Sequence, residues 1–324
     1  MKFEFDKKQI QRIASEHHYT ATNVEKVIRL CLILDDLNSI DEFAGKLLLK
    51  GGTAINLIAF DKLPRLSVDL DLDFAHNISK EETDCQREII NEALSAYSEN
   101  MGYSLSDRSN FILDSKSLTY TTTTGSIDKI KLDINYHSRC HVYPAVRSYV
   151  TMPFGVINIP MQVTHVDVIE LFAGKIKAFY ERCKPRDIFD IYSLAKSGLL
   201  LGKEERDALR KCVVFYSVLG NTDRPDILKQ DLNGIRKMPF QAFKTQLLPM
   251  LHTQMGHFDK DGLVDIVVGY LESLMILNDN ENEFIDRFFK GDFRPALLFD
   301  ETTSNILKLH PMILRTLQML DISH

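Results

Sequence analysis

The sequence predicts an α+β fold, with a mixed sheet and flanking helices over residues 1–165 and a mostly α-helical domain over residues 166–324. Before residue 165, helical apolar stripes alternate with short runs of apolar and β-branched residues that are typical of strands. After it, only helical stripes recur. A chain of 324 residues with 44% hydrophobic side chains is long enough for two domains of this kind.

In the first domain, helical and strand-like segments follow one another closely. We expect helices over residues 7–18, 22–38, 53–60 and 79–100. Ser79 with Glu82 three residues later is the capping-box pattern that begins the last of them. We expect strands over residues 46–50, 66–74 and 156–163, and a β-hairpin formed by residues 117–124 and 130–136 around Gly125-Ser126.

The second domain begins where Asp167 and Glu170 again resemble a capping box, ahead of an apolar stripe of helical spacing. Pro185 ends this first helix. We expect further helices near residues 186–197, 204–218, 240–253, 261–277, 282–290 and 303–320.

Composition narrows the class of protein. A net charge of −6 argues against general coating of nucleic acid, although it allows one local basic patch. The sequence contains no run of about 18 apolar residues that could cross a membrane, and its first residues lack an apolar signal core. The five cysteines are scattered, odd in number and without a C-x-x-C pair, which indicates structural thiols in a reducing cytoplasm.

The most informative segment runs from Lys50 to Asp73. Gly51-Gly52 follows an apolar run and precedes a helical pattern, and such a turn offers backbone N–H groups to an anion. At its end, Asp69, Asp71 and Asp73 occupy every second position and therefore share one face of a strand. Their mutual repulsion is relieved by a hard cation such as Mg²⁺ or Mn²⁺, which takes oxygen ligands. The segment predicts a site for a metal ion and a nucleotide.

The row of aspartates also resembles a calcium-binding loop and a charged edge strand. An EF-hand loop counted from Asp69 would need Gly at its sixth position and Glu at its twelfth, where Phe74 and Lys80 stand. A solvated edge strand, with charges that block aggregation, stays open. Farther on, Asp133 lies within an apolar strand pattern, so it either pairs with a cation or joins Asp69 and Asp71 around the metal.

A second cluster of charges spans residues 170–192. Lys175 and Arg182 are seven residues apart and share a helix face, and Asp187 and Asp190 follow in the first turn of the next helix. The acidic pair could simply complement a helix dipole, and Lys175 could be a solvated surface residue. However, residues 173–187 hold five basic side chains against two acidic ones, which favours a patch for a triphosphate or an RNA backbone.

The remaining motifs give little support to a different class of site. His137, Cys140 and His141 form a loose metal-like group without a second half to complete four ligands. The P-loop, Rossmann, zincin and serine-hydrolase signatures are absent from the sequence.

With Gly51-Gly52-Thr53, Arg65-x-Ser67-x-Asp69-x-Asp71, a strand aspartate and the block from Lys175 to Asp190 in this order, the chain resembles the AbiEii/AbiGii nucleotidyltransferase toxins. These include the mycobacterial MenT toxins and belong to the superfamily of DNA-polymerase-β-like nucleotidyltransferases. The resemblance implies a polymerase-β-like core over residues 1–165 and a helical domain that completes the active-site cleft. It also implies a toxin–antitoxin or phage-defence (abortive infection) function.

The resemblance further implies roles for individual residues. Gly51, Gly52 and Thr53 would hold the triphosphate of an NTP, with Arg65 and Ser67 ordering the site or touching phosphate. Asp69 and Asp71 would ligate Mg²⁺, and Asp133 would match a third carboxylate. Lys175 would match the family's essential lysine, which binds nucleotide, and Asp187 its late catalytic aspartate. Asp73 goes beyond the usual Asp-x-Asp pair and Asp190 belongs to the late block, and the resemblance assigns a role to neither.

The implied reaction is transfer of a nucleoside monophosphate to an acceptor, in some members the 3′ end of tRNA, with pyrophosphate released. A cognate antitoxin is the implied protein partner. Two alternatives stay open at this point: a nucleotidyltransferase that modifies a protein hydroxyl or a small molecule of the antibiotic type, and a non-catalytic binding protein.

Overall fold

The computed structural model describes residues 4–60, 63–156, 160–224, 232–252 and 258–322. Contacts divide the chain into two compact units, which are described separately below. The first, called the N-terminal unit, comprises Met1–Arg139, Ala145–Val166 and Pro249–Met255. The second, called the C-terminal unit, comprises Cys140–Pro144, Asp167–Leu248 and Gly256–His324. Each unit therefore includes one short segment that lies, along the chain, within the other.

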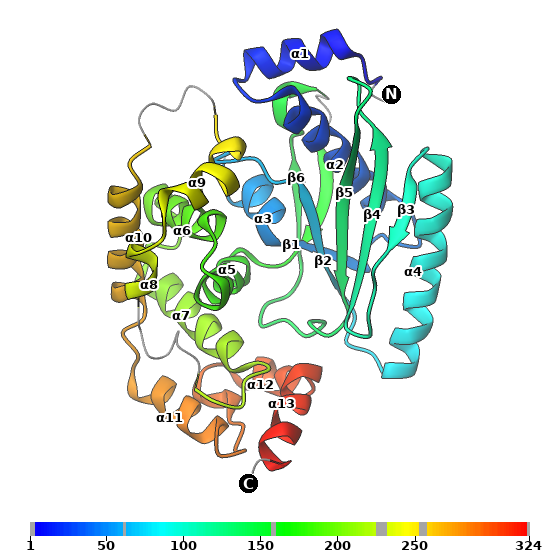
Figure 1. Cartoon of the computed structure of the whole chain (residues 1–324). Helices are drawn as coiled ribbons and strands as arrows, with labels where there is room; N and C mark the ends of the chain where they lie inside the picture. The colour runs from blue at the N-terminus through cyan, green and yellow to red at the C-terminus, as the bar shows by residue number, and fades with distance from the viewer. Residues whose placement is uncertain (1–3, 61–62, 157–159, 225–231, 253–257, 323–324) are drawn as a thin grey trace. The chain divides into compact units, whose positions relative to one another are not determined.

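The N-terminal unit is built on a seven-stranded mixed sheet with the order β3-β4-β5-β2-β1-β7-β6 (Figure 1). The strands are β1 Leu47–Lys50, β2 Asp69–Phe74, β3 Ser104–Asp107, β4 Leu113–Thr121, β5 Ile127–Asn135, β6 Val146–Val150 and β7 Met161–His165. The β1–β7 and β2–β5 pairs are parallel, and the other neighbours are antiparallel. Both central strands, β1 and β2, carry the predicted nucleotide motif at one end.

Alternation of side chains gives this sheet one apolar and one polar face. In β2 the residues Leu70 and Leu72 are fully buried, while Asp69 and Asp71 between them are only half-buried. In β4 and β5 the alternate residues Leu118 and Leu132 are likewise buried. The strand pattern read from the sequence is therefore confirmed, and the aspartates share one face of the sheet.

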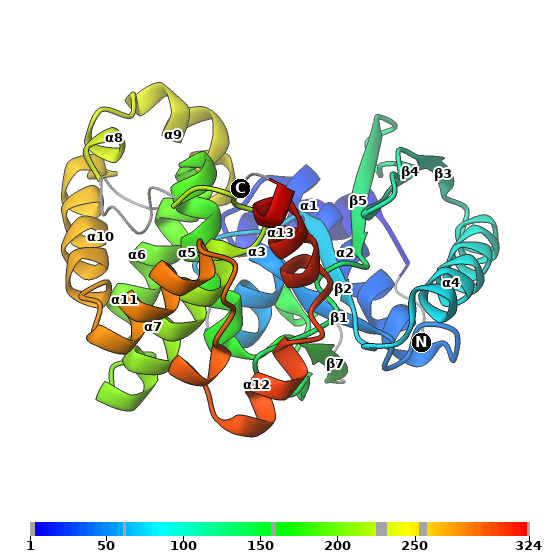
Figure 2. The ribbon, with the colours of Figure 1, turned by 90° about the horizontal axis from the view of Figure 1, so that it is seen from below.

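Helices of the N-terminal unit pack on and beside the sheet (Figures 1 and 2). They are α1 Lys7–Glu16, α2 Ala21–Ser39, α3 Gly51–Ala54 and α4 Lys80–Asn100, with a π-helical turn at Ile55–Ala59 and a 3₁₀ turn at Pro153–Gly155. Helix α2 contacts β2, β5 and β7, and its residues Val24, Ile28 and Leu34 are buried. Helix α4 begins at the predicted Ser79–Glu82 capping box.

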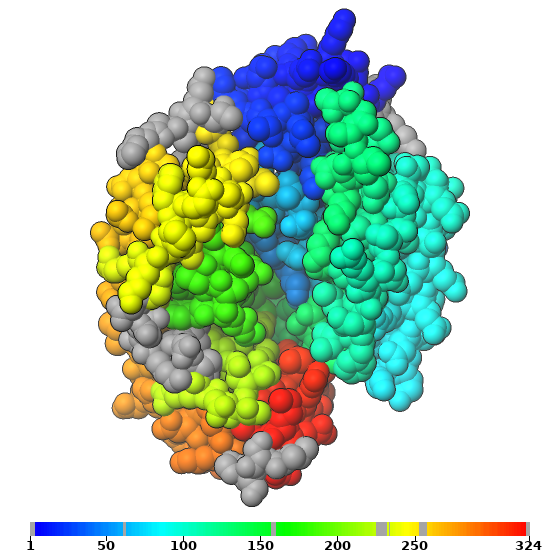
Figure 3. Space-filling model, in the orientation of Figure 1, coloured from blue at the N-terminus to red at the C-terminus, as the bar shows by residue number. Residues whose placement is uncertain are grey.

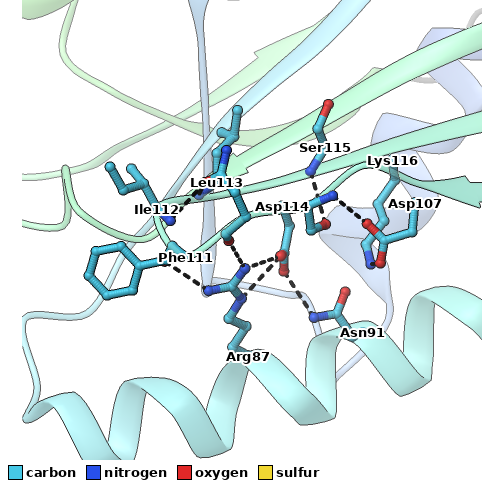
Figure 4. A network of polar contacts seen from close by, with 11 residues as sticks. Arg87, Asn91, Asp107, Phe111, Ile112, Leu113, Asp114, Ser115 and Lys116 are labelled. Atoms are coloured by element: carbon cyan, nitrogen blue, oxygen red, sulfur yellow. Dashed lines mark hydrogen bonds and ion pairs between the residues drawn. The ribbon is translucent and has the colours of Figure 1, made fainter.

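Arg87 fastens α4 to β4 (Figure 4). Its Nε donates to Asp114 Oδ1 at 3.0 Å, and its Nη1 and Nη2 donate to the carbonyls of Phe111 and Asn110. Asn91 Nδ2 donates to the other oxygen of Asp114 at 2.9 Å. Asp114 is 1% exposed, so the guanidinium and the amide supply the partners that a buried carboxylate requires.

The C-terminal unit is helical. Its helices are α5 Val168–Arg182, α6 Pro185–Ser197, α7 Lys203–Val218, α8 Asn233–Arg236, α9 Phe240–Gln246, α10 Lys260–Leu274, α11 Asp279–Phe288, α12 Glu301–Leu307 and α13 Pro311–Ile322. Short 3₁₀ turns occupy Pro295–Leu297 and, at the boundary between the units, Leu248–Met250. In the part of the chain that the structure describes, no helix is both long and apolar enough to span a membrane.

Several boundaries differ from those expected. The helix expected over 53–60 begins at Gly51 and turns π-helical at Ile55. The single helix expected over 303–320 is two helices, because Pro311 cannot continue α12 and instead begins α13. The helix expected over 240–253 ends at Gln246, and residue 253 lies outside the described residues.

The strands differ from the expected ones in number and in extent. Strands β3 and β6, both at the edges of the sheet, were not expected, because their short mixed sequences carry no clear alternation. The strand expected over 156–163 corresponds to β7, which begins only at Met161, while residues 157–159 lie outside the described residues. At the start of α5, Asp167 caps Ile169 N, but Glu170 accepts from Tyr143 N at 2.6 Å instead of closing a capping box.

Candidate active site

Gly51 brings the start of α3 against the acidic strand. It has φ +69°, a backbone conformation that favours glycine, and Lys50 before it lies opposite Asp71 in the antiparallel β1–β2 pair. An added Cβ on Gly51 would lie 2.9 Å from Cγ of Asp71 and overlap its carboxylate. Only glycine therefore lets the Asp71 carboxylate lie directly against the first turn of α3.

Gly52 makes the matching close approach to the residues that precede the strand. A Cβ there would lie 2.7 Å from Nη2 of Arg65 and 3.1 Å from Oγ of Ser67. Arg65 is 2% exposed, and its Nη1 donates to the Leu66 carbonyl at 2.9 Å. Thr53 completes the connection, because its Oγ1 donates to the Asp69 carbonyl at 2.6 Å. The structure thus brings together the Gly-Gly-Thr turn and the Arg-x-Ser-x-Asp-x-Asp segment.

The neighbouring strand β5 adds Asp133 and a lysine. Asp133 is in register with Asp71, and Lys131 is in register with Asp69. The Asp133 carboxylate accepts from Ser115 Oγ at 2.7 Å and from Lys131 Nζ at 2.5 Å. The cation partner was one of the two outcomes that the sequence left open, and Asp133 is half-buried rather than fully enclosed.

Lys131 lies in the electrostatic field of three aspartates on this face. Partial burial by itself would lower the pKa of Lys131, but its hydrogen bond to Asp133 and the charges of nearby aspartates outweigh this effect and raise the pKa. Those neighbours are Asp71 and Asp69. Sequence reasoning missed Lys131, although its position two residues before Asp133 places both side chains on the same face.

Asp73, whose role the sequence did not define, forms an ion pair with Lys50. The distance from Lys50 Nζ to Asp73 Oδ1 is 2.5 Å, and Asp73 is 3% exposed. A buried carboxylate needs such a partner. The Asp73–Lys50 pair therefore connects the end of β1 to β2. Asp73 lies two residues after Asp71, whose carboxylate faces the Gly-Gly turn.

The donor set fits a small hard cation that shares its ligands with a substrate. Within the described ranges, no three His, Cys, Asp or Glu side chains are arranged to hold a metal ion, which also counts against zinc at His137, Cys140 and His141. However, Mg²⁺ is usually held by one or two carboxylates together with substrate phosphates rather than by an all-protein cage. Asp69 and Asp71, on one face beside the Gly-Gly turn, fit this type of binding.

The C-terminal unit contains a compact buried cluster around Lys175 of α5. Lys175 Nζ lies 2.9 Å from Asp187 Oδ1 and 3.0 Å from Asp190 Oδ2, both on α6. Arg182 Nε donates to Asp187 Oδ2 at 2.7 Å. Lys175 is 7% exposed, so the interpretation of it as a solvated surface residue is wrong. Asp187 lies in the first turn of α6, whereas Asp190 lies beyond the expected first turn, and both pair with the Lys175 ammonium.

The charges in this cluster keep Asp187 ionised. Burial alone would raise the pKa of Asp187, but the hydrogen bonds and charges of Arg182 and Lys175 lower it to about 2. Of the five basic residues, Lys175 is buried and pairs with two aspartates, so it is not part of an open basic patch. Arg182 and Lys184 are exposed, although Arg182 also pairs with Asp187.

Comparisons with known proteins place these features in a family. Residues 32–260 match the family model described as nucleotidyl transferase AbiEii toxin, type IV toxin–antitoxin system. The chain belongs to this family. The AbiEii match spans the Gly-Gly turn, the acidic strand and the Lys175 cluster. Membership makes the protein a nucleotidyltransferase toxin of a type IV toxin–antitoxin system, and it sets aside the alternative of a non-catalytic binding protein.

A solved structure supports the fold. The structure is similar to MenT4, a nucleotidyltransferase toxin from Mycobacterium tuberculosis H37Rv, with a TM-score of 0.62 and 14% identity over 98% of this chain and 99% of that one. An antigenic nucleotidyltransferase-like protein from Paracoccidioides brasiliensis matches with a TM-score of 0.35 and 16% identity over 65% of this chain and 88% of that one. No curated protein gives a significant match.

These findings confirm the expected fold class and the resemblance to the AbiEii toxins. Family membership implies an NTP as substrate and a cognate antitoxin as partner.

The glycine geometry generates a first prediction. Gly51→Ala should lower nucleotide transfer by about 100-fold, because the new Cβ displaces the Asp71 carboxylate from the turn and small misplacements of reacting groups have effects of this size. Gly174→Ala is the matched control: it lies on helix α5 with open space around its Cα and should keep activity within about twofold of wild type. Equal activity of the two variants would contradict the proposed geometry.

The Lys175 cluster generates a second prediction. Lys175→Ala should lower the free energy of unfolding by about 3 kcal/mol, because it removes one partner of a buried ion pair. Lys177→Ala, on the same helix with a surface partner, should change it by less than about 0.5 kcal/mol. Denaturant unfolding at pH 7 measures both. Transfer assayed at a temperature where both are folded should fall only for Lys175→Ala.

Proposed function

We propose that the protein transfers a nucleoside monophosphate from an NTP to the 3′ hydroxyl of an RNA, most simply tRNA, in a reaction that depends on Mg²⁺. The observation that carries the proposal is the row of carboxylates on adjacent strands beside the Gly-Gly turn, with Asp71 against Gly51 and Asp133 in register with Asp71. This face combines oxygen ligands for a cation with backbone N–H groups at a helix start.

In the proposed arrangement, Asp69 and Asp71 hold Mg²⁺, and Asp133 supplies a third carboxylate beside them. The turn of Gly51, Gly52 and Thr53 binds the triphosphate. The side chains of Arg65 and Ser67 lie so close to Gly52 that a Cβ at this position would collide with them. Their proposed role is therefore to hold Gly52 in place and not to contact the substrate. Bound Mg²⁺ would neutralise phosphate charge and lower the pKa of the attacking hydroxyl.

The reaction itself requires mainly positioning. The acceptor oxygen attacks the α-phosphorus, the bond from that phosphorus to the bridging oxygen of the β-phosphate breaks, and pyrophosphate leaves. The proton of the acceptor hydroxyl passes to a carboxylate of this face or to solvent. Lys131, whose charge lies near Asp133, Asp71 and Asp69, offsets their mutual repulsion before substrate binds.

Lys175 and Asp187 are proposed to serve the same reaction from the helical unit. Asp187 and Asp190 hold the Lys175 ammonium in one orientation, and Asp187 stays ionised because its pKa is about 2. A lysine oriented in this way can act as a point charge toward phosphate.

An RNA acceptor is supported by exposed positive charge on the sheet face that carries the aspartates. Lys129 and Lys131 both project from the polar face of β5, and both are exposed. In the space-filling view, atoms of β4 and β5 form part of the visible surface of the N-terminal unit (Figure 3). Lysines on such a surface can contact backbone phosphates of one RNA end. The thiols are all free, and the NTP pool is cytoplasmic, so we propose that the protein acts in the cytoplasm.

The metal assignment can be tested by charge removal. Asp69→Asn and Asp71→Asn should each lower transfer by at least about 100-fold and relieve growth inhibition, because each removes a ligand and the charge that supports it. The half-buried positions of both residues predict unchanged circular dichroism. Normal transfer in both variants would refute the site.

The acceptor can be identified with labelled NTPs and Mg²⁺, added to wild-type protein with either total RNA or a protein extract. We expect label in RNA, and its loss when the 3′ diol of that RNA has first been oxidised with periodate. Label in the protein fraction, or in small molecules alone, would instead support the second candidate, a nucleotidyltransferase that modifies a protein hydroxyl or an antibiotic-type molecule.

A further inference from the structure

Asn56 is a buried polar residue that the motif pattern does not include. It lies four residues after Gly52, in the π-helical turn Ile55–Ala59, and is 2% exposed. Its Nδ2 donates to the Gly52 carbonyl at 2.6 Å. This carbonyl oxygen can only accept, so the amide nitrogen must be the atom that faces it. The side chain therefore contacts the turn proposed to bind the triphosphate.

The other end of the Asn56 amide faces a small cavity. No described residue donates a hydrogen bond to Asn56 Oδ1, although this atom is buried. The cavity leaves ≈ 10 Å³ of space accessible to a water molecule, and its polar lining comes from Asn56, Thr53 and Ser67. Apolar walls come from α2, among them Val27 and Cys31. This space is at the lower limit for one water and its walls are mostly apolar. The amide keeps its nitrogen on the Gly52 carbonyl although this leaves its oxygen without a donor.

The backbone explains why a side chain is needed at this point. Ile55 N–H bonds to the carbonyls of both Gly51 and Gly52, where the helix changes from α to π geometry. Asn56 adds a second donor to the Gly52 carbonyl and so limits rotation of the peptide that joins Gly52 to Thr53. On the opposite side, Arg65 and Ser67 lie against the Gly52 Cα. The Gly52 peptide is thus held from two directions.

We infer that Asn56 is a positioning residue for nucleotide binding: it fixes the Gly52–Thr53 peptide so that its N–H faces the triphosphate. The inference rests on the proposed function, because the turn must bind a triphosphate for its orientation to matter. Isolated π-helical turns occur often at functional sites, and a buried unsatisfied amide oxygen requires an explanation.

Two truncations of this side chain separate positioning from packing. Asn56→Ser keeps a hydroxyl that can donate to the carbonyl four residues earlier, which is the Gly52 carbonyl, whereas Asn56→Ala does not. Binding of a non-hydrolysable NTP analogue with Mg²⁺ should weaken about tenfold in Asn56→Ala and less than about threefold in Asn56→Ser. Cys31→Ala, which enlarges the same cavity from α2, should bind as wild type does.

The measurements distinguish the possible failures. Thermal unfolding checks that the variants are folded at the assay temperature, and a similar loss of stability in Asn56→Ala and Cys31→Ala with different binding supports positioning. Equal binding by Asn56→Ala, Asn56→Ser and wild type would overturn the inference and leave the proposed function intact. Absence of binding by wild type itself would overturn the proposed function.

Discussion

The close contact between a glycine turn and an acidic strand determines the geometry of the N-terminal unit. Because Gly51 and Gly52 lack Cβ atoms, the start of α3 can lie against Asp71 on one side and Arg65 and Ser67 on the other. Side chains at either position would separate the turn from the strand. The carboxylates and the backbone N–H groups, which have opposite preferences for charge, are thereby held next to one another.

Electrostatic balance is the second constraint on the site. Three aspartates on one strand face, with a fourth on the neighbouring strand, would repel one another. Lysines offset this cost locally: Lys50 pairs with Asp73, and Lys131 pairs with Asp133. In the helical unit the charges are arranged the other way round: two buried aspartates pair with the single positive charge of Lys175. These lysines and aspartates thus have counter-charges before any substrate or metal ion is bound.

The two units exchange short segments of chain, which a linear division of the sequence does not anticipate. Pro249–Met255 belongs to the N-terminal unit. There the Met250 carbonyl accepts a hydrogen bond at 2.8 Å from the backbone N–H of Leu66, the residue between Arg65 and Ser67 in the sequence. Conversely, Cys140–Pro144 belongs with the helices, and Tyr143 N donates to the buried Glu170 there. Residues remote in sequence therefore support the segment that carries the motif.

The sequence alone determined the α+β class, most helices, the alternation that places Asp69 and Asp71 on one face, and the family. The fold class, the helices and the alternation follow from local periodicity, and the family follows from short motifs and their order along the chain. Tertiary structure decided what local pattern could not: the register that places Asp133 beside Asp71, the burial of Lys175 between Asp187 and Asp190, and the edge strands β3 and β6. Those features depend on which segments pack together, and packing partners distant along the chain leave no periodic signal in either segment.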